Sequence, residues 1–395
     1  MDRIVVTGIG AISAIGNSVA ENRLSLIEGK CGMGRLEMFP SKFSTSLPVA
    51  EIKISTEALK EKLRAFEQGV TRTTLLALHA IEEAIADSRL NTTEISSFDT
   101  ALIGASTVGG MCLTDEMYQD SKKDSPGSEY LSSYDYASIN MYLQKRYAMS
   151  GPVNTINTAC SSSANAIMYG ARLIRSGRVK RAIVGGVDSL AKFTINGFNA
   201  LHILSNEICT PFDEKRKGLN LGEAAAFLVL EKESDVVGKK IYASLSGYSN
   251  ANDSFHASSL SDEGIGPYKV MNDALMSAQL DPLQIDFINA HGTATENNDK
   301  VESVAMLRLF GKAPAFASTK GNIGHTLGAA GAIEAVYCIL NLSEQELYPA
   351  LHFKKPIPET GLEPVLAYTK KALTHIMSNS FGFGGNCSSL IFSKG

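Results

Sequence analysis

The segment Asn157-Thr158-Ala159-Cys160-Ser161-Ser162-Ser163-Ala164-Asn165-Ala166 decides how this chain is read, because it places a cysteine where a helix of small residues begins. Two histidines follow on glycine-containing loops, in Ala290-His291-Gly292-Thr293 and in Gly324-His325-Thr326. A nucleophilic thiol needs a proton acceptor and donors for an oxyanion, and histidines on such loops can supply both. The three residues together indicate an acyl-transferring enzyme.

Composition narrows the class of protein. The chain has 395 residues, of which 44% are hydrophobic and 20% are charged, as in globular proteins of two or three domains. The net charge of −4, with no long basic run, argues against a nucleic-acid partner. No apolar run is long enough to span a membrane, and the N-terminus does not look like a signal peptide. We therefore expect a cytoplasmic protein with neither nucleic acid nor membrane as partner.

The other cysteines favour ordinary packing. The six cysteines stand at positions 31, 112, 160, 209, 338 and 387, scattered and without a CxxC pair. This pattern predicts neither a disulfide framework nor a metal site. For Cys31, Cys112, Cys209 and Cys338 we expect small buried hydrophobic residues.

Apolar runs of strand length alternate with helical stretches. Strands are predicted at 4–6, 101–104, 182–185 and 226–230, and helices at 73–87, 161–176 and 328–341. This alternation predicts an α/β fold with buried sheets. Cys160 and His325 each precede an alanine-rich helix, which indicates two similar halves. With a polar linker at 231–240, we expect residues 1–236 to carry the cysteine, and residues 237–395 to carry the histidines and a late glycine-rich loop.

A dinucleotide-binding motif is a competing interpretation near the N-terminus. The stretch Gly8-Ile9-Gly10-Ala11-Ile12-Ser13 follows a predicted strand, but its third glycine is replaced by serine. The acidic residue that should end a second strand is missing as well. We therefore expect a tight strand-to-loop turn here and no nicotinamide cofactor.

The candidate chemistry centres on Cys160. Backbone N–H groups at the helix start are expected to lower the pKa of its thiol and to stabilise an oxyanion. Two neutral imidazoles, those of His291 and His325, would stabilise an enolate, although a lone histidine is more often structural. Lys320 and Glu334 flank the second histidine, either as a buried ion pair that fixes its loop or as ordinary surface groups.

A late loop, Ser380-Phe381-Gly382-Phe383-Gly384-Gly385-Asn386, combines glycine with aromatic residues. Glycine allows movement and exposes backbone donors, and phenylalanine supplies an apolar plug. The alternative is a glycine-rich strand or bulge.

In this combination the chain resembles the β-ketoacyl-acyl-carrier-protein synthases, the condensing enzymes of the thiolase-like superfamily. The resemblance extends over nearly the whole chain and includes three further motifs, Val108-Gly109-Gly110, Pro211-Phe212-Asp213 and Leu221-Gly222-Glu223-Ala224-Ala225-Ala226. It implies a five-layer αβαβα fold of two similar halves, usually a homodimer, and acyl carrier protein as partner. It implies no cofactor beyond the phosphopantetheine arm of that carrier protein.

The resemblance also implies roles for single residues. Cys160 would accept the acyl group, and His291 and His325 would support decarboxylation of malonyl-carrier protein and stabilise the enolate. The backbone N–H groups of Cys160 and Phe383 would form the oxyanion hole, and Phe383 would gate the acyl pocket. The resemblance further assigns the supporting pair Lys320 and Glu334, the arm-binding Thr293 and Thr295, and the substrate-binding residues Val108, Phe198, Phe381 and Asp253.

Three departures from the family pattern stand out. The loop 206–210 is short, Gly222-Glu223-Ala224 replaces Gly-Glu-Gly, and Asn386-Cys387 replaces the Thr-Asn that follows the gate glycines. In the family that asparagine tethers the gate to an aspartate, here Asp253, and Cys387 cannot replace it well. With Asn298-Asp299, the first two departures also resemble synthases of aryl-polyene or flexirubin-type pigments.

Several alternatives remain open at this point. They are housekeeping fatty-acid elongation, a pigment synthase, a degradative thiolase, and a non-catalytic chain-length partner, which would lack the cysteine. A heterodimer with such a partner could replace the homodimer. For docking of the acidic carrier protein, the sequence offers the basic residues Arg64, Arg72, Lys122 and Lys123.

Overall fold

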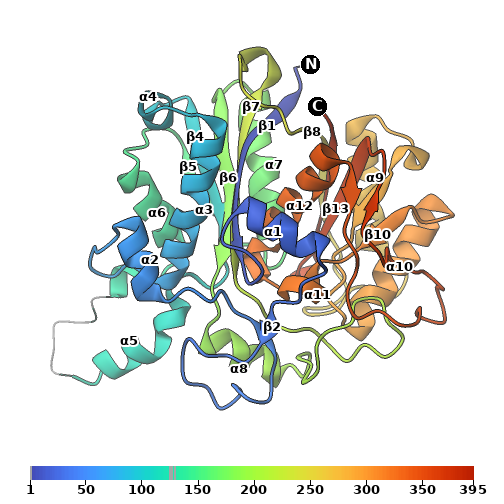
Figure 1. Cartoon of the computed structure of the whole chain (residues 1–395), viewed down its shortest axis with the longest axis horizontal. Helices are drawn as coiled ribbons and strands as arrows, with labels where there is room; N and C mark the ends of the chain where they lie inside the picture. Colours follow the sequence, from blue (N-terminus) through green and yellow to red (C-terminus); the bar gives the residue numbers. More distant parts are fainter. Residues whose placement is uncertain (1, 124–127, 129) are drawn as a thin grey trace.

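Ten strands form the main sheet, and the same arrangement of five occurs twice along the chain (Figure 1). The computed structural model describes residues 2–123, 128 and 130–395. The first five strands are β1 (Ile4–Ser13), β4 (Thr100–Ala105), β5 (Val153–Ile156), β6 (Arg181–Asp188) and β7 (Ala224–Lys232). The second five are β8 (Ala243–Asn252), β9 (Phe287–Asn289), β10 (Ala315–Ala317), β13 (His375–Phe381) and β14 (Asn386–Lys394).

The two sets of five have the same topology. The order across the sheet is β10-β9-β13-β14-β8-β1-β7-β6-β4-β5, so each set runs third, second, fourth, fifth, first from its outer edge. In both sets the third, second and fourth strands are parallel, and the fifth is antiparallel to both of its neighbours. The halves join where Val5 and Val6 of β1 pair with β8. The two similar halves expected from the sequence are thus present.

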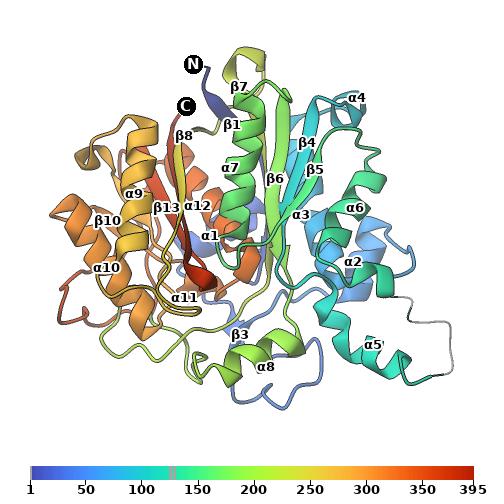
Figure 2. The same cartoon turned by 180° about the vertical axis from the view of Figure 1, so that it is seen from behind.

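Helices complete five layers. The helices of the first half are α1 (Val19–Ile27), α2 (Thr56–Leu63), α3 (Arg72–Ser88), α4 (Thr92–Ser96), α5 (Thr114–Asp120), α6 (Ala137–Arg146), α7 (Ser162–Arg175) and α8 (Lys192–Ala200). Those of the second half are α9 (Ile265–Ala278), α10 (Glu296–Phe310), α11 (Lys320–Ile323) and α12 (Ala330–Glu344). The helices α7 and α12 lie together at the centre, with α3 and α6 outside one half and α9 and α10 outside the other (Figures 1 and 2). This is the α/β thiolase-like αβαβα fold.

Shorter elements connect these layers. The 3-10 turns are η1 (Gly109–Leu113), η2 (Leu131–Ser133), η3 (Glu233–Asp235), η4 (Pro282–Gln284), η5 (Leu327–Ala329) and η6 (Phe383–Gly385). Two small antiparallel ribbons pair β2 (Met33–Gly34) with β3 (Val49–Ala50), and β11 (Glu346–Leu347) with β12 (Thr369–Lys370).

The strand β7 shows how the sequence builds these layers. Its residues Ala224, Ala226, Leu228 and Leu230 face the central helices, and Ala225, Phe227 and Val229 face α3. Both faces are apolar because the strand is buried on both sides, which explains the continuous apolar run in the sequence. A third apolar cluster lies under α9 and α10 in the second half.

All the strands and helices predicted above are present, with two corrections. The predicted turn at residues 8–13 is wrong, because Gly8 and Gly10 lie inside β1. A Cβ at Gly10 would come within 2.1 Å of the Ala80 carbonyl oxygen, so glycine serves the close approach of α3. The predicted linker begins too early, because Glu231 and Lys232 still belong to β7. Within the described ranges, no helix is both long and apolar enough to cross a membrane.

Candidate active site

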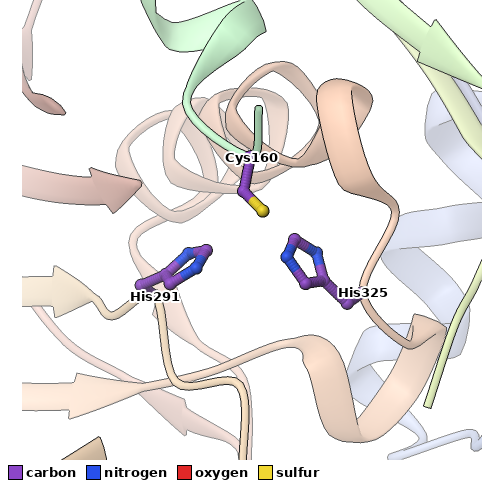
Figure 3. A group of neighbouring side chains, drawn as sticks. All are labelled: Cys160, His291 and His325. Atoms are coloured by element: carbon purple, nitrogen blue, oxygen red, sulfur yellow. The ribbon is translucent and has the colours of Figure 1, made fainter. Parts of the chain in front are cut away.

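Loops from both halves meet around one cavity. Cys160 follows β5, His291 follows β9, His325 precedes α12, and Phe383 lies between β13 and β14. The cavity has a volume of about 450 Å³, and all four of these residues line it. The three side chains of the cysteine and histidines converge (Figure 3), with the sulfur and one nitrogen of each imidazole within 4.8 Å of one another. The topology therefore assembles the three residues that the sequence singled out.

Cys160 lies at a strained turn just before α7. Ala159 has a φ of 54°, a left-handed conformation that costs free energy in a non-glycine residue. The helix begins at Ser162 with Ser161 as its N-cap, one residue later than the sequence suggested. Cys160 is only 5% exposed, and it belongs to the lining of the cavity. A substrate can therefore reach the sulfur only through the cavity.

The expected lowering of the thiol pKa at Cys160 is wrong for the resting enzyme. Burial raises the pKa of Cys160 to about 11, because a desolvated thiolate is costly. The Lys320 ammonium and the backbone N–H of Phe383 act in the opposite direction without reversing the shift. The same N–H group therefore lies on the side of the cavity where the sulfur is, as the predicted oxyanion-hole donor should.

Both histidines are neutral and present N–H groups to the cavity. Burial and the nearby Lys320 charge hold the pKa of His291 and of His325 well below the usual range. The backbone N–H of Leu327 donates to Nδ1 of His325 at 3.3 Å, which leaves the proton on Nε2. Among the described residues, Nε2 of His325 has no hydrogen-bond partner. The two rings meet edge to face with centroids 5.3 Å apart, so this free donor points into a site shared with His291.

The predicted ion pair between Lys320 and Glu334 is present and buried. Lys320 Nζ lies 2.5 Å from Glu334 Oε1, with both side chains 2% exposed. The same ammonium donates to the carbonyl oxygen of His291 at 2.5 Å and lies 3.5 Å from its Nδ1. A donor at Nδ1 again places the imidazole proton on Nε2. The pair therefore supports the His291 loop, in addition to the His325 loop named in the sequence interpretation.

Sequence reasoning missed two buried carboxylates that shape the catalytic loops. Glu302 on α10 accepts hydrogen bonds from the backbone N–H groups of His291 and Gly292, each at 2.9 Å, and burial raises its pKa to about 7. Asp188 at the end of β6 accepts from Val108 N–H at 2.9 Å and from Gly328 N–H at 2.7 Å, which joins loops of the two halves. An acidic residue directly after an apolar strand is a signal that could have identified Asp188.

Phe383, the residue predicted to gate the pocket, stacks on a second aromatic ring. Phe383 and Phe198 lie with ring centroids 5.8 Å apart and 20° between their planes. Phe381 also lines the cavity, with its ring centroid 5.7 Å from that of His291. Val108 does not line this cavity, but it belongs with Phe198 to an adjoining apolar cluster. Phe383 is thus placed between the sulfur and an apolar wall.

Asp253 supports the gate but does not face the cavity. Its carboxylate accepts hydrogen bonds from Ser261 and Gly266, and its backbone N–H donates to the Gly385 carbonyl oxygen at 2.7 Å. Its polar groups are thus engaged by protein and it is not among the residues that line the cavity, so its assignment as a substrate-binding residue stays a prediction. Cys387 is fully buried in an apolar cluster with Phe381, so the family tether between these two positions is not made by the Cys387 side chain.

Two threonines lie on the wall of the cavity that contains the Cys160 sulfur. Thr293 and Thr295 both line the cavity, and their hydroxyl oxygens are 2.8 Å apart. Arg216 and Lys217 also line it, and Lys217 pairs with Glu207 of the short loop 206–210 at 2.6 Å. The loop is held by Asn220, whose amide oxygen accepts from Cys209 N–H at 2.7 Å.

The basic residues proposed for docking separate into two groups. Arg72 is unavailable, because its side chain is only 10% exposed and its guanidinium forms an ion pair with the buried Glu223. Arg64, Lys122 and Lys123 are exposed near α2 and α5, and they do not belong to the cavity lining.

Comparison with known proteins agrees with this geometry. The N-terminal domain of β-ketoacyl synthases matches residues 1–236, and the C-terminal domain of β-ketoacyl synthases matches residues 242–354. The chain therefore belongs to the β-ketoacyl synthase family, and it is an acyltransferase of the condensing type.

Individual relatives cover the whole chain. It is 31% identical to 3-oxoacyl-[acyl-carrier-protein] synthase 2 of Staphylococcus aureus (strain COL), over 99% of this chain and 98% of the relative. A chain in the structure of the ketosynthase ApeO in complex with its chain length factor ApeC, from Xenorhabdus doucetiae, is 30% identical with a TM-score of 0.86, covering 100% of this chain and 98% of that one. A type II polyketide ketosynthase, AntDE, solved with its acyl-carrier protein AntF, is 26% identical with a TM-score of 0.90 and full coverage of both chains.

Proposed function

We propose that the chain elongates an acyl group on carrier protein, with Cys160 as the acyl acceptor. The observation that best supports this proposal is that one sulfur and two neutral imidazoles converge in the lining of one cavity. The imidazole of His325 has an N–H group without a hydrogen-bond partner in the described residues. Neutral N–H donors in a desolvated site stabilise developing negative charge without any reorganisation of solvent.

The reaction then proceeds in two halves. The Cys160 sulfur attacks the thioester carbon of an acyl-carrier protein; its proton leaves with the departing carrier thiolate, and an acyl-cysteine forms. Malonyl-carrier protein enters next, its carboxylate leaves as carbon dioxide, and the electron pair forms an enolate held by His291 and His325. The enolate carbon attacks the acyl-cysteine, which forms the new carbon–carbon bond and expels the Cys160 thiolate.

Other residues have supporting roles in this proposal. The backbone N–H groups of Cys160 and Phe383 hold the oxyanion in the first half, and Phe383 closes over the acyl chain. Lys320 and Glu334 hold the histidine loops. Thr293 and Thr295 bind the phosphopantetheine arm, which the carrier protein brings, so no free cofactor is required.

For partners we propose acyl carrier protein and a second subunit. The polyketide ketosynthase above is bound to its carrier protein, and ApeO is bound to a chain length factor. On this chain, β5 is an outer strand of the sheet and is only partly buried, so its unpaired edge is available for another chain. Exposed apolar residues lie on α6, which packs against β5, and on the turn η2 beside α6; they are Met141 and Leu131. A homodimer is the simplest assembly that covers them, and a heterodimer with a chain-length partner is the alternative.

We further propose a division at residue 236/237 and a cytoplasmic location. The passage between the halves lies between β7 and β8. Six free cysteines, one of them the nucleophile, suit a reducing compartment.

A pigment pathway is a second candidate for the biological role. The short loop 206–210 and Ala224 after Glu223 distinguish this chain from the fatty-acid pattern. A degradative thiolase and a non-catalytic partner are less well supported, because Cys160 is present beside two histidines and is the only cysteine in the cavity lining of the described chain.

Half-reactions test the proposal directly. Cys160→Ala should abolish self-acylation and condensation with the fold intact, as judged by circular dichroism. Cys160→Gln, whose amide resembles an acylated cysteine, should still decarboxylate malonyl-carrier protein. Intact-protein mass spectrometry with a panel of acyl-carrier proteins would identify the preferred chain. Condensation by Cys160→Ala at near wild-type rate would remove the cysteine from the mechanism.

A further inference from the structure

The turn that carries Phe383 is closed on itself and lies against the nucleophile. The Gly382 N–H donates to the carbonyl oxygen of Asn386 at 2.8 Å, and the Gly385 N–H donates to the Gly382 carbonyl oxygen at 3.1 Å. A Cβ at Gly382 would come within 2.7 Å of the Thr158 carbonyl oxygen and 3.2 Å of the Cys160 nitrogen. Small displacements of this turn would therefore change the distance between the Phe383 N–H and the sulfur.

One side chain ties the end of the turn to three neighbours. The amide oxygen of Asn386 accepts hydrogen bonds from the Ser161 hydroxyl at 2.7 Å, from Asn165 Nδ2 at 2.9 Å and from Asn250 Nδ2 at 2.8 Å. Ser161 is the residue after the nucleophile, Asn165 lies on α7, and Asn250 lies on β8. The start of β14 is thus fixed to the nucleophile helix and to the adjoining strand.

The donors in this group are themselves oriented. Asn165 Nδ2 also donates to the Thr158 hydroxyl at 2.8 Å, and its Oδ1 accepts from the Ser388 hydroxyl at 2.9 Å. These contacts decide which end of the Asn165 amide faces Asn386. The Ser161 hydroxyl has one hydrogen and lies within reach of two acceptors, the Thr158 carbonyl oxygen at 2.8 Å and the Asn386 amide oxygen at 2.7 Å. The amide donors of Asn165 and Asn250 therefore provide the firmer part of the contact, and they limit the movement of the Asn386 side chain.

This arrangement differs from the family pattern quoted above. There, the second residue after the gate glycines is an asparagine tethered to an aspartate. Here that residue is Cys387, packed among apolar side chains, and the Asp253 carboxylate is bonded to Ser261 and Gly266. The asparagine of this chain stands one position earlier in the sequence than in the family pattern, at Asn386, and its side chain contacts Ser161 and Asn165 at the nucleophile helix.

We propose that Asn386 is a positioning residue, whose amide oxygen holds the gate turn on the nucleophile helix so that the Phe383 N–H faces the Cys160 sulfur. The proposal rests on the proposed role of Cys160 as acyl acceptor. During acylation, negative charge moves onto the thioester oxygen, which the N–H groups of Phe383 and Cys160 stabilise. Asn386 therefore acts on the acylation half-reaction and not on the malonyl half-reaction, which depends on the histidines.

Three variants test this division of labour. Asn386→Leu removes the acceptor at similar size, Asn386→Asp keeps an oxygen acceptor, and Ser393→Ala removes a buried hydroxyl elsewhere on the same strand. Single-turnover acylation of Cys160, followed by intact mass, should slow about tenfold to a hundredfold in Asn386→Leu, as expected for a misplaced reacting group. Asn386→Asp and Ser393→Ala should acylate near the wild-type rate. Wild-type acylation by Asn386→Leu would overturn the proposal.

A second measurement separates positioning from general damage. The double variant Cys160→Gln/Asn386→Leu should decarboxylate malonyl-carrier protein as fast as Cys160→Gln alone. An equal slowing of both half-reactions would mean that Asn386 only maintains the fold, which contradicts the proposal. If Cys160→Gln itself fails to decarboxylate, the proposed function fails, whatever Asn386 does.

If Asn386→Leu does not fold, Asn250→Ala can test the same proposal. Asn250 is exposed and supplies one of the three donors, so its removal should leave the fold intact. We expect the same selective slowing of acylation, smaller in size. Unchanged acylation in this variant would contradict the proposal.

Discussion

At the scale of single residues, the proposed scheme assigns the second half of the reaction to the two histidines. His291 and His325 are neutral and buried, and neither is needed to form the acyl-cysteine in the scheme above. We expect His291→Ala and His325→Ala to retain most self-acylation of Cys160 and to lose malonyl decarboxylation, each by about a hundredfold or more. Separate assays of the two half-reactions check this. Normal decarboxylation in both variants would exclude the enolate role.

The Cys160 thiol has a pH dependence that the structure specifies. Since burial raises its pKa to about 11, the thiol is protonated at neutral pH, and the thiolate fraction should rise about tenfold per pH unit up to that pKa. Alkylation by iodoacetamide should therefore increase steadily from pH 7 to pH 9. A plateau near pH 7 would instead indicate a thiolate stabilised by the helix start, as the sequence alone suggested. Cys160→Ala provides the background rate of the other cysteines.

At the scale of elements, the loop between β13 and β14 is held at both ends by these strands, and it carries the partly exposed ring of Phe383. Phe383 stacks on Phe198, while Gly384 and Gly385 both have a φ of 79°, a conformation that strongly favours glycine. Phe383→Ala should slow condensation more than it slows acylation by a short acyl group, because an apolar plug must exclude water before enolate attack. Pre-steady-state acylation is compared with turnover, and Phe193→Ala, an exposed aromatic residue on α8, serves as control. Unchanged turnover in Phe383→Ala would remove the gate from the mechanism.

The sequence predicted those helices and strands well whose burial leaves a continuous pattern of apolar residues in the sequence. Apolar runs and alanine-rich helices identified β6, β7, α7 and α12, because burial on both faces requires continuous apolar residues. Contacts between distant segments could not be predicted in this way. The bonds from Glu302 to the His291 loop, and from Asp188 to loops of both halves, join residues far apart in the chain without a local signature. Arg72 was expected among the basic residues for docking, but its side chain is largely covered and forms an ion pair with the buried Glu223.

At the scale of the whole molecule, the repeated topology explains why the site lies where the halves meet. Cys160 precedes the central helix α7 of one half and His325 precedes the central helix α12 of the other, so the pseudo-symmetry brings the two side chains together (Figure 3). His291 comes from the second half alone, after β9. The sequence indicated the duplication through the two alanine-rich helices, but the register of the two halves depends on the β1–β8 pairing, which has no motif.

Basic residues at the surface of the whole molecule could attract an acidic carrier protein. Arg64, Lys122 and Lys123 lie on the side of the molecule that carries α2 and α5, while Arg216 and Lys217 line the cavity itself (Figure 1). An acidic carrier protein spans more surface than the arm it delivers, so basic groups beyond the mouth can attract it. The phosphopantetheine thioester alone makes no use of such groups.

Reversing these charges should therefore separate the two kinds of substrate. We expect Arg64→Glu/Lys122→Glu/Lys123→Glu to raise the KM for acyl-carrier protein several-fold and to weaken the dependence of kcat/KM on salt, since exposed charges act through a screened field. The KM for a small pantetheine thioester should change little. Lys371→Glu, at an exposed residue after β12, controls for the reversal of a single charge elsewhere on the surface. Equal losses with both substrates would contradict docking of the carrier protein at these three residues.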